Sequence, residues 1–176
     1  MLKGYIEGYY GRLFSRDERA KVINHMGKLK MDFYLYGPKE DLYHRIEWGK
    51  TYPSKEQKTL RNLVDQCKKN KIKPIFAISP GLQSSKLSKN FIKTLTSKLK
   101  QAHQLGFKDF AIFFDDIEHK KDKELAKFHL TIINLVSSID FLKKNSLMVC
   151  PTVYCKSFAK GNIQKKRISK SSCRGY

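Results

Sequence analysis

Short apolar runs recur along this chain at intervals of about 30 to 40 residues, which is the length of a strand followed by a helix and too long for a hairpin. These runs predict five strands, at Gly4–Glu7, Phe33–Tyr36, Pro74–Ser79, Phe110–Phe114 and Leu147–Cys150. Amphipathic stretches fill the space between them. The alternation of strands and helices predicts an α/β protein with a parallel sheet.

The stretches between the strands carry helix patterns. Ser15-Arg-Asp-Glu18 has the spacing of a capping box, and Ser54 to Gln57 repeats that spacing. Apolar residues then recur at helical intervals and predict one buried face per helix. The predicted faces are Val22, Ile23, Met26 and Leu29; Leu60, Leu63, Val64 and Cys67; Phe91, Ile92, Leu95, Leu99 and Ala102; and Leu125, Phe128, Ile132, Leu135, Val136 and Ile139.

An open doubly wound sheet and a barrel both fit this order of elements. The segment from Glu7 to Arg12 lacks the GxGxxG spacing of a dinucleotide-binding loop, which favours the barrel. A complete (β/α)8 barrel takes about 250 residues, and this chain has 176. We therefore expect a (β/α)8 TIM-type barrel truncated to about its first four to five β/α units, over residues 1–155. Unpaired barrel edges would favour self-association.

The net charge of +20 raises the possibility of a nucleic-acid-binding protein. Seven of the basic residues lie in residues 156–176, which contain no acid and few apolar side chains. That segment is predicted to be a basic tail, either disordered or the product of a frameshift. The other lysines are dispersed over predicted helix faces, and no nucleic-acid motif accompanies them, so nucleic-acid binding is the less favoured alternative.

Location and redox state follow from what the chain lacks. No apolar run approaches the roughly 20 residues needed to span a bilayer, and the N-terminus has no secretory signal pattern. We therefore expect a cytoplasmic protein with no membrane association. The four cysteines match neither a zinc ribbon nor a CxxC motif, which indicates reduced thiols. Cys67 lies on a predicted apolar helix face and is expected in the core.

Asp115 and Asp116 follow the apolar run Phe-Ala-Ile-Phe-Phe directly, at the carboxyl end of the fourth predicted strand. Active sites of α/β barrels gather at these strand ends. Two acids there are costly unless they are paired, metal-bound or used. Paired carboxylates suit glycoside hydrolysis, and neighbours in sequence suit a mechanism in which the sugar's own acetamido oxygen attacks. A helix N-cap with a first-turn acid, or a divalent-metal site, are the alternatives.

Five segments at successive strand ends are Gly4–Arg12, Tyr34–Asp41, Ala77–Gly81, Phe113–Ile117 and Cys150–Cys155. Together they resemble glycoside hydrolase family 84, which contains O-GlcNAcases and bacterial β-N-acetylglucosaminidases. The resemblance covers roughly residues 3–158. It implies a substrate that carries β-linked N-acetylglucosamine, on a glycan or a glycoprotein. It also implies retaining, substrate-assisted hydrolysis through an oxazoline, without a metal or an organic cofactor.

The resemblance implies roles for residues at the matching motif positions. Asp115 would polarise the acetamido N–H, and Asp116 would be the general acid/base. The substrate-binding residues that it implies are Gly8, Tyr10, Lys39, Cys150 and Tyr154.

Four of these five binding residues also have a structural interpretation. Lys39 and the Gly8 backbone would bind sugar hydroxyls, but Lys39 could be a surface lysine and Gly8 could only serve a tight turn. Tyr154 would border the acetamido pocket. Tyr10 and Cys150 would line the site, although Tyr10 could pack in the core and Cys150 could be a buried small hydrophobe.

Four further residues that invite a functional role receive a structural one. We expect His44, Arg45 and Trp48 to pack or form ion pairs, and His119 to be an exposed histidine at a helix start.

Two departures from the family pattern limit the functional expectation. Leu13 and Phe14 stand where the family often has Pro-Trp. The family's later strands supply Asn and Asp residues that grip the sugar hydroxyls, and this chain ends before them. An inactive fragment and a noncatalytic carbohydrate-binding remnant are therefore alternatives to an active hydrolase.

Overall fold

The computed structural model describes residues 1–80, 88–115, 122–143 and 146–155. Asp116, His119 and the basic segment 156–176 lie outside these ranges, so what the sequence predicts for them stays a prediction.

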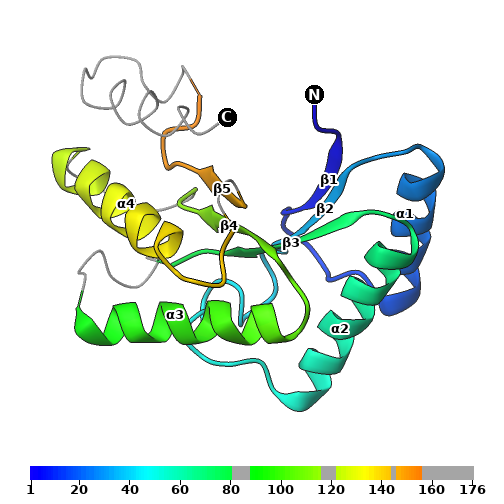
Figure 1. Ribbon diagram of the computed structural model, residues 1–176, viewed down its shortest axis with the longest axis horizontal. Coiled ribbons are helices and arrows are strands. Elements are labelled where there is room, and N and C mark those ends of the chain that lie inside the picture. Colours follow the sequence, from blue (N-terminus) through cyan, green and yellow to red (C-terminus); the bar gives the residue numbers. More distant parts are fainter. Residues whose placement is uncertain (81–87, 116–121, 144–145, 156–176) are drawn as a thin grey trace.

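Five strands form one parallel sheet whose spatial order is also the chain order, β1-β2-β3-β4-β5 (Figure 1). The strands are β1 (Gly4–Glu7), β2 (Phe33–Tyr36), β3 (Lys73–Ile78), β4 (Asp109–Phe113) and β5 (Leu147–Cys150). A doubly wound sheet reverses its order at a switch point, and this sheet has no reversal. The barrel prediction is therefore confirmed, with five strands of a (β/α) barrel present. β3 and β4 each lie one residue earlier than the sequence predicts.

Four helices connect these strands and cover one face of the sheet (Figure 1). They are α1 (Arg16–Lys28), α2 (Ser54–Lys69), α3 (Lys89–Gln104) and α4 (Asp122–Ser137). The larger apolar core lies between the helices and the sheet, and the apolar face predicted for α2 is fully buried, Cys67 included. The apolar periodicity of the sequence therefore predicted which side of these helices packs on the sheet.

The two predicted capping boxes have different outcomes. The first is confirmed, since Ser15 Oγ accepts from the Glu18 N–H at 3.2 Å and a Glu18 carboxylate oxygen accepts from the Ser15 N–H at 2.8 Å. The second, at Ser54, is wrong. Pro53 is the N-cap of α2 in extended backbone, and Gln57 donates to the Tyr52 carbonyl at 2.8 Å instead.

Leu29 also departs from its prediction. It was expected on the buried face of the first helix, but it is the C-cap of α1 and its side chain is exposed. The helix ends there because the next residue, Lys30, has a positive φ of 52°, which turns the chain away.

A second, smaller apolar cluster lies on the other face of the sheet, the face that lines the interior of a barrel. It consists of Leu35, Ile75, Ala77, Ala111 and Phe113, with Phe33, Met148 and Cys150 packed against it. This inner face is covered at the centre and open at the β1 edge. Leu35 on β2 is 2% exposed, whereas its register partner Ile6 on β1 is 52% exposed.

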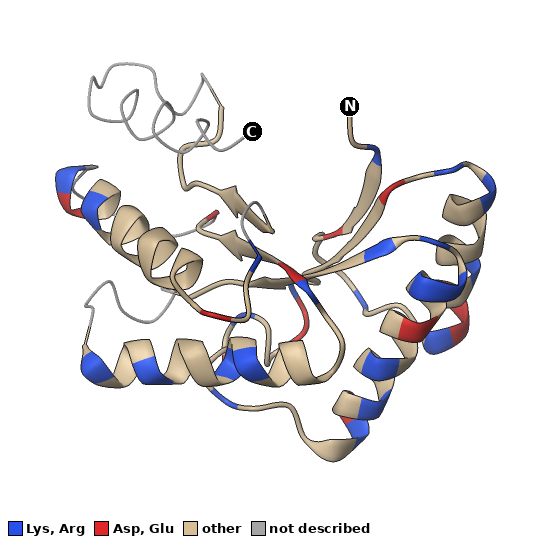
Figure 2. Cartoon of the chain, in the orientation of Figure 1, with Lys and Arg blue, Asp and Glu red and all other residues tan. Residues whose placement is uncertain are grey.

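Lys and Arg positions are spread along all four helices and not confined to one of them (Figure 2). This agrees with the dispersed lysine pattern of the sequence. None of the helices in the described part of the chain is long and apolar enough to cross a membrane.

Candidate active site

The carboxyl ends of the five strands meet at one edge of the sheet because all of them run parallel. The residues that end the strands are Glu7, Tyr36, Ile78, Phe113 and Cys150. The segments that follow them carry the predicted site residues, so the topology gathers these residues at one place, as it does in a barrel.

Lys39 and Asp115 form the centre of this edge. Lys39 follows β2 and is only 5% exposed, and its ammonium group donates a hydrogen bond to Oδ2 of Asp115, which follows β4. The other carboxylate oxygen, Oδ1, is buried and has no hydrogen-bond partner among the described residues. A buried acceptor without a donor is costly. Asp115 therefore has one oxygen bonded to Lys39 and one that can still accept a hydrogen bond.

α4 is described from Asp122 onward, so the helix N-cap that was one alternative for the Asp115 and Asp116 pair falls outside the described residues and stays untested. Within the described ranges, no three His, Cys, Asp or Glu side chains are grouped to hold a metal ion.

The ring of Phe113 lies beneath this pair on the inner face of the sheet. Lys39 Nζ is 5.6 Å from the ring centroid, and the His44 ring meets it edge-on at 6.1 Å. A Cβ added to Gly37 would lie 2.9 Å from the Phe113 ring, so the residue at this position has to be glycine for the ring to lie against the backbone.

Two more predicted site residues lie around the same ring. A Cβ on Gly8 would be 3.9 Å from Phe113. Cys150 is in register with Phe113 on β5 and packs against the same inner cluster, partly buried. The structure thus brings Gly8, Lys39, Asp115 and Cys150 together around Phe113.

Tyr10 and Tyr154 lie farther out, on the segments after β1 and β5, and both are exposed. The Tyr10 hydroxyl accepts from Arg45 at 3.0 Å, and the Arg45 guanidinium stands 5.1 Å from the Tyr10 ring centroid. Core packing of Tyr10 is therefore ruled out, and the packing role expected for Arg45 is confirmed.

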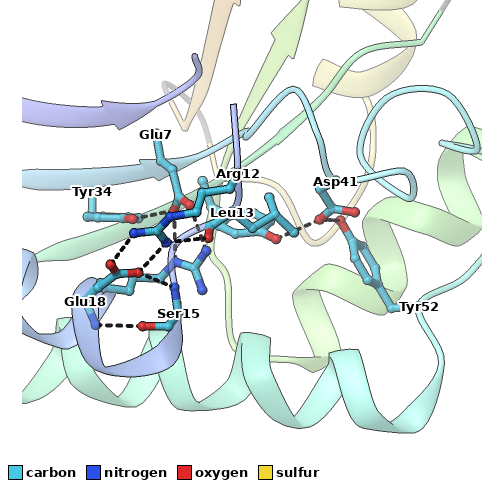
Figure 3. A network of polar contacts seen from close by, with 10 residues as sticks. Glu7, Arg12, Leu13, Ser15, Glu18, Tyr34, Asp41 and Tyr52 are labelled. Atoms are coloured by element: carbon cyan, nitrogen blue, oxygen red, sulfur yellow. Dashed lines mark hydrogen bonds and ion pairs between the residues drawn. The ribbon is translucent and has the colours of Figure 1, made fainter. Parts of the chain in front are cut away.

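Asp41 anchors the loop that carries Lys39, a role that the sequence did not predict. Its buried carboxylate accepts from the Tyr52 hydroxyl at 2.8 Å (Figure 3). It also accepts from the Tyr36 hydroxyl at 2.7 Å and from the Tyr43 N–H at 2.9 Å. These bonds tie the loop to β2 and to the segment before α2. Tyr52 comes 11 residues after Asp41, and no local pattern indicates that pairing.

Two buried bases support the same loop. His44 lies 2.9 Å from the Ala77 carbonyl through Nδ1, and burial lowers its pKa to about 4, so its ring is neutral at pH 7 and Nδ1–H donates. Lys98 on α3 donates to the Lys50 carbonyl and stands 3.9 Å from the Tyr52 ring centroid, and burial lowers its pKa to about 7. The packing role expected for His44 is confirmed.

Trp48 packs in the core, where its ring meets Phe91 edge-on at 5.0 Å. The packing role expected for this residue is confirmed as well.

The model of the β-N-acetylglucosaminidase family matches residues 3–170. This chain belongs to that family. Protein O-GlcNAcase of Mus musculus is 34% identical over 170 residues, and that of Rattus norvegicus is 33% identical. The solved structure of CpGH84B superposes with a TM-score of 0.82 at 28% identity. The resemblance to glycoside hydrolase family 84 is thereby confirmed.

The chain spans only part of the length of these relatives. The alignment covers 93% of this chain but 19% of the mouse O-GlcNAcase, and the superposition covers 97% of this chain but 31% of CpGH84B. The five strands correspond to the N-terminal portion of the family 84 barrel.

Proposed function

We propose that this protein acts in the hydrolysis of β-linked N-acetylglucosamine by a retaining, substrate-assisted mechanism. The observation that carries the proposal is that the two Asp115 carboxylate oxygens have different surroundings. Oδ2 accepts a hydrogen bond from Lys39, and Oδ1 is buried without a partner among the described residues. The N–H of a bound 2-acetamido group would donate to Oδ1. That bond increases the electron density on the amide oxygen, which attacks the anomeric carbon.

Asp116 is proposed as the general acid and then the general base. In the first step the acetamido oxygen bonds to the anomeric carbon, the glycosidic bond breaks, and Asp116 protonates the leaving oxygen. In the second step Asp116 accepts a proton from water, and that water opens the oxazoline at the anomeric carbon. Asp115 offsets the positive charge on the oxazolinium nitrogen throughout.

The remaining predicted residues are proposed to hold the sugar. Lys39 and the Gly8 backbone bind hydroxyls, Tyr154 borders the acetamido pocket, and Tyr10 and Cys150 line the site. The arrangement of Gly8, Lys39 and Cys150 around Phe113 supports this proposal. The chemistry needs two carboxylates and water, so we propose no metal and no organic cofactor.

A noncatalytic carbohydrate-binding role is the second candidate. It rests on the Lys39 and Asp115 contact alone, because a carboxylate with one oxygen free of a donor among the described residues can bind an amide N–H without a general acid. In this case the Asp115 and Lys39 half of the site would bind an N-acetyl sugar without turning it over.

We also propose that copies of the chain associate through the open barrel edges, because Ile6 exposes an apolar side chain beside the outer edge of β1. Sedimentation velocity tests this, and a strict monomer would contradict it. The cytoplasmic location expected from the sequence also stays part of the proposal.

Hydrolysis of a chromogenic β-N-acetylglucosaminide tests the main proposal. Asp116→Asn should lower kcat by about 10²- to 10⁴-fold, the usual contribution of a general acid. Asp65→Asn, an exposed change on α2, should leave the rate unchanged. Turnover that survives Asp116→Asn would contradict the proposal. Sugar binding that needs Asp115 but gives no turnover would favour the second candidate.

A further inference from the structure

The pairing of β4 with β5 continues past the ends of both strands through a side chain. The parallel ladder includes the bond from the Phe114 N–H to the Cys150 carbonyl, at 2.8 Å. In a regular parallel ladder the next bond would run from the N–H of Thr152 to the carbonyl of Phe114. Here the Thr152 hydroxyl donates to that carbonyl, at 2.5 Å. A side chain thus extends the ladder to the residue before Asp115.

The Thr152 hydroxyl is itself held from α4. Nε2 of His129, a buried residue, lies 3.2 Å from Thr152 Oγ1, and the His129 ring stacks on the Phe114 ring at 4.0 Å between centroids. A hydroxyl has one proton, and the Phe114 carbonyl can only accept it. His129 must therefore donate from Nε2, which fixes a chain of bonds from His129 through Thr152 to the Phe114 carbonyl.

The held carbonyl belongs to the peptide bond that precedes Asp115. Because that bond is planar, fixing its carbonyl also fixes the orientation of the Asp115 N–H and limits the directions that the Asp115 side chain can take. The Asp115 carboxylate can accept from Lys39, on the loop after β2, only if the Asp115 side chain points toward that loop. Small misplacements of a reacting group reduce rates severely, by about 10²-fold for 1 Å.

We propose that Thr152 and His129 are positioning residues that fix the direction in which Asp115 leaves β4. The inference rests on the proposed function only where it concerns the sugar. The geometric part, from His129 to the Phe114 carbonyl, stands without any ligand.

The first test needs no sugar. Thr152→Val removes the hydroxyl and keeps the side-chain shape, Thr152→Ser restores the hydroxyl, and Thr131→Val is the matched control. Thr131 lies on α4 with His129 and, like Thr152, donates to a backbone carbonyl, that of Lys127 at 2.8 Å, but it is exposed. Nitrogen-15 NMR should find the His129 proton on Nε2 in the wild type. The backbone amide resonance of Asp115 should move in Thr152→Val and stay in place in Thr152→Ser and Thr131→Val.

His129→Phe provides a second route if Thr152→Val does not fold, because phenylalanine keeps the stack on Phe114 and removes the donor. It should shift the Asp115 amide in the same direction as Thr152→Val. An Asp115 resonance unmoved in both variants, or a wild-type His129 with its proton only on Nδ1, would overturn the inference.

The second test uses a thiazoline analogue of N-acetylglucosamine. Thr152→Val should weaken binding of this analogue by about tenfold or more, because displacement of the Asp115 carboxylate by a fraction of an ångström is costly. Thr152→Ser should restore the wild-type affinity. Where turnover is measurable, kcat should fall while KM changes little. A wild type that does not bind the analogue contradicts the proposed function, and the Asp115 resonance then decides the positioning role alone. Equal binding by wild type and Thr152→Val would overturn the inference.

Discussion

Lys39 donates a hydrogen bond to Asp115, although 76 positions separate them in the chain, and the side chain of Lys39 is only 3% exposed. A cation this buried needs an opposite charge, so the pair holds the β2 and β4 ends of the site together. Asp115→Asn should therefore lower the free energy of unfolding by about 3 kcal/mol, because it removes the negative charge to which the buried Lys39 ammonium donates. Urea unfolding monitored by circular dichroism measures this loss.

The double variant Lys39→Met with Asp115→Asn tests whether the two residues contribute to the free energy of unfolding together or independently. It should be more stable than the sum of the two single losses allows. Glu47→Gln is the control. The Glu47 carboxylate accepts from the solvent-exposed Lys50 ammonium at 2.8 Å, so this substitution should lower the free energy of unfolding by less than about 0.5 kcal/mol. Strict additivity of the Lys39 and Asp115 changes would argue against coupling.

The buried ion pair beneath β1 makes a second prediction. Glu7 accepts from Arg19 at 2.9 and 2.7 Å and from the Tyr34 hydroxyl, and no part of Glu7 is exposed (Figure 3). Glu7→Gln should destabilise the fold by about 3 to 5 kcal/mol, because it leaves Arg19 buried without a counter-charge. Replacing both residues, Glu7→Leu with Arg19→Met, should recover most of that loss. Equal destabilisation by the single and double changes would show that the charges are not coupled.

His44 should make stability depend on acid pH. Burial lowers its pKa in the folded state to about 4, below the value of about 6.5 for a free histidine. Between these values the unfolded chain binds more protons, so the contribution of neutral His44 is complete above pH 6.5 and is lost as the pH falls toward 4.

The measurement compares wild type with His44→Gln by urea unfolding from pH 7 to pH 4. The stability difference between them should shrink by about 3 kcal/mol over that range. His25→Gln, an exposed change on α1, should leave the wild-type pH dependence intact. A constant difference between wild type and His44→Gln would contradict the buried neutral imidazole.

Lys98 makes the corresponding prediction at alkaline pH. Burial lowers its pKa from 10.5 to about 7, so above pH 7 the unfolded chain binds the extra proton. The free energy of unfolding of wild type minus that of Lys98→Met should therefore increase as the pH rises from 7 to 9, by up to about 1.4 kcal/mol per pH unit. The exposed change Lys100→Met on the same helix should show no such trend, and a flat profile for Lys98→Met would refute the burial effect.

The sequence predicted the features that depend on local patterns. Strand and helix order follows from apolar periodicity, and the Ser15 capping box needs only two residues three positions apart. The same local rule failed at Ser54, because Pro53 already supplies the extended N-cap and Gln57 finds the Tyr52 carbonyl.

The sequence could not predict the contacts that support the site. Asp41 with Tyr52, and Thr152 with His129, join residues on different elements, and nothing in the spacing of either pair indicates that they meet. Such contacts follow from the tertiary packing of helices on the sheet. That Lys39 and Asp115 lie at one site could be predicted only because the carboxyl ends of parallel strands share one edge of the sheet.

The central claim is that Asp115 receives the acetamido N–H of an N-acetyl sugar on its free oxygen. Titration of the protein with the thiazoline analogue of N-acetylglucosamine, followed through the carboxyl carbon-13 resonance of Asp115, tests it most directly. We predict that this resonance shifts on binding and that Asp115→Asn abolishes binding, while Asp65→Asn does not. Binding that leaves the Asp115 carboxyl resonance unmoved, or that survives Asp115→Asn, would contradict the account.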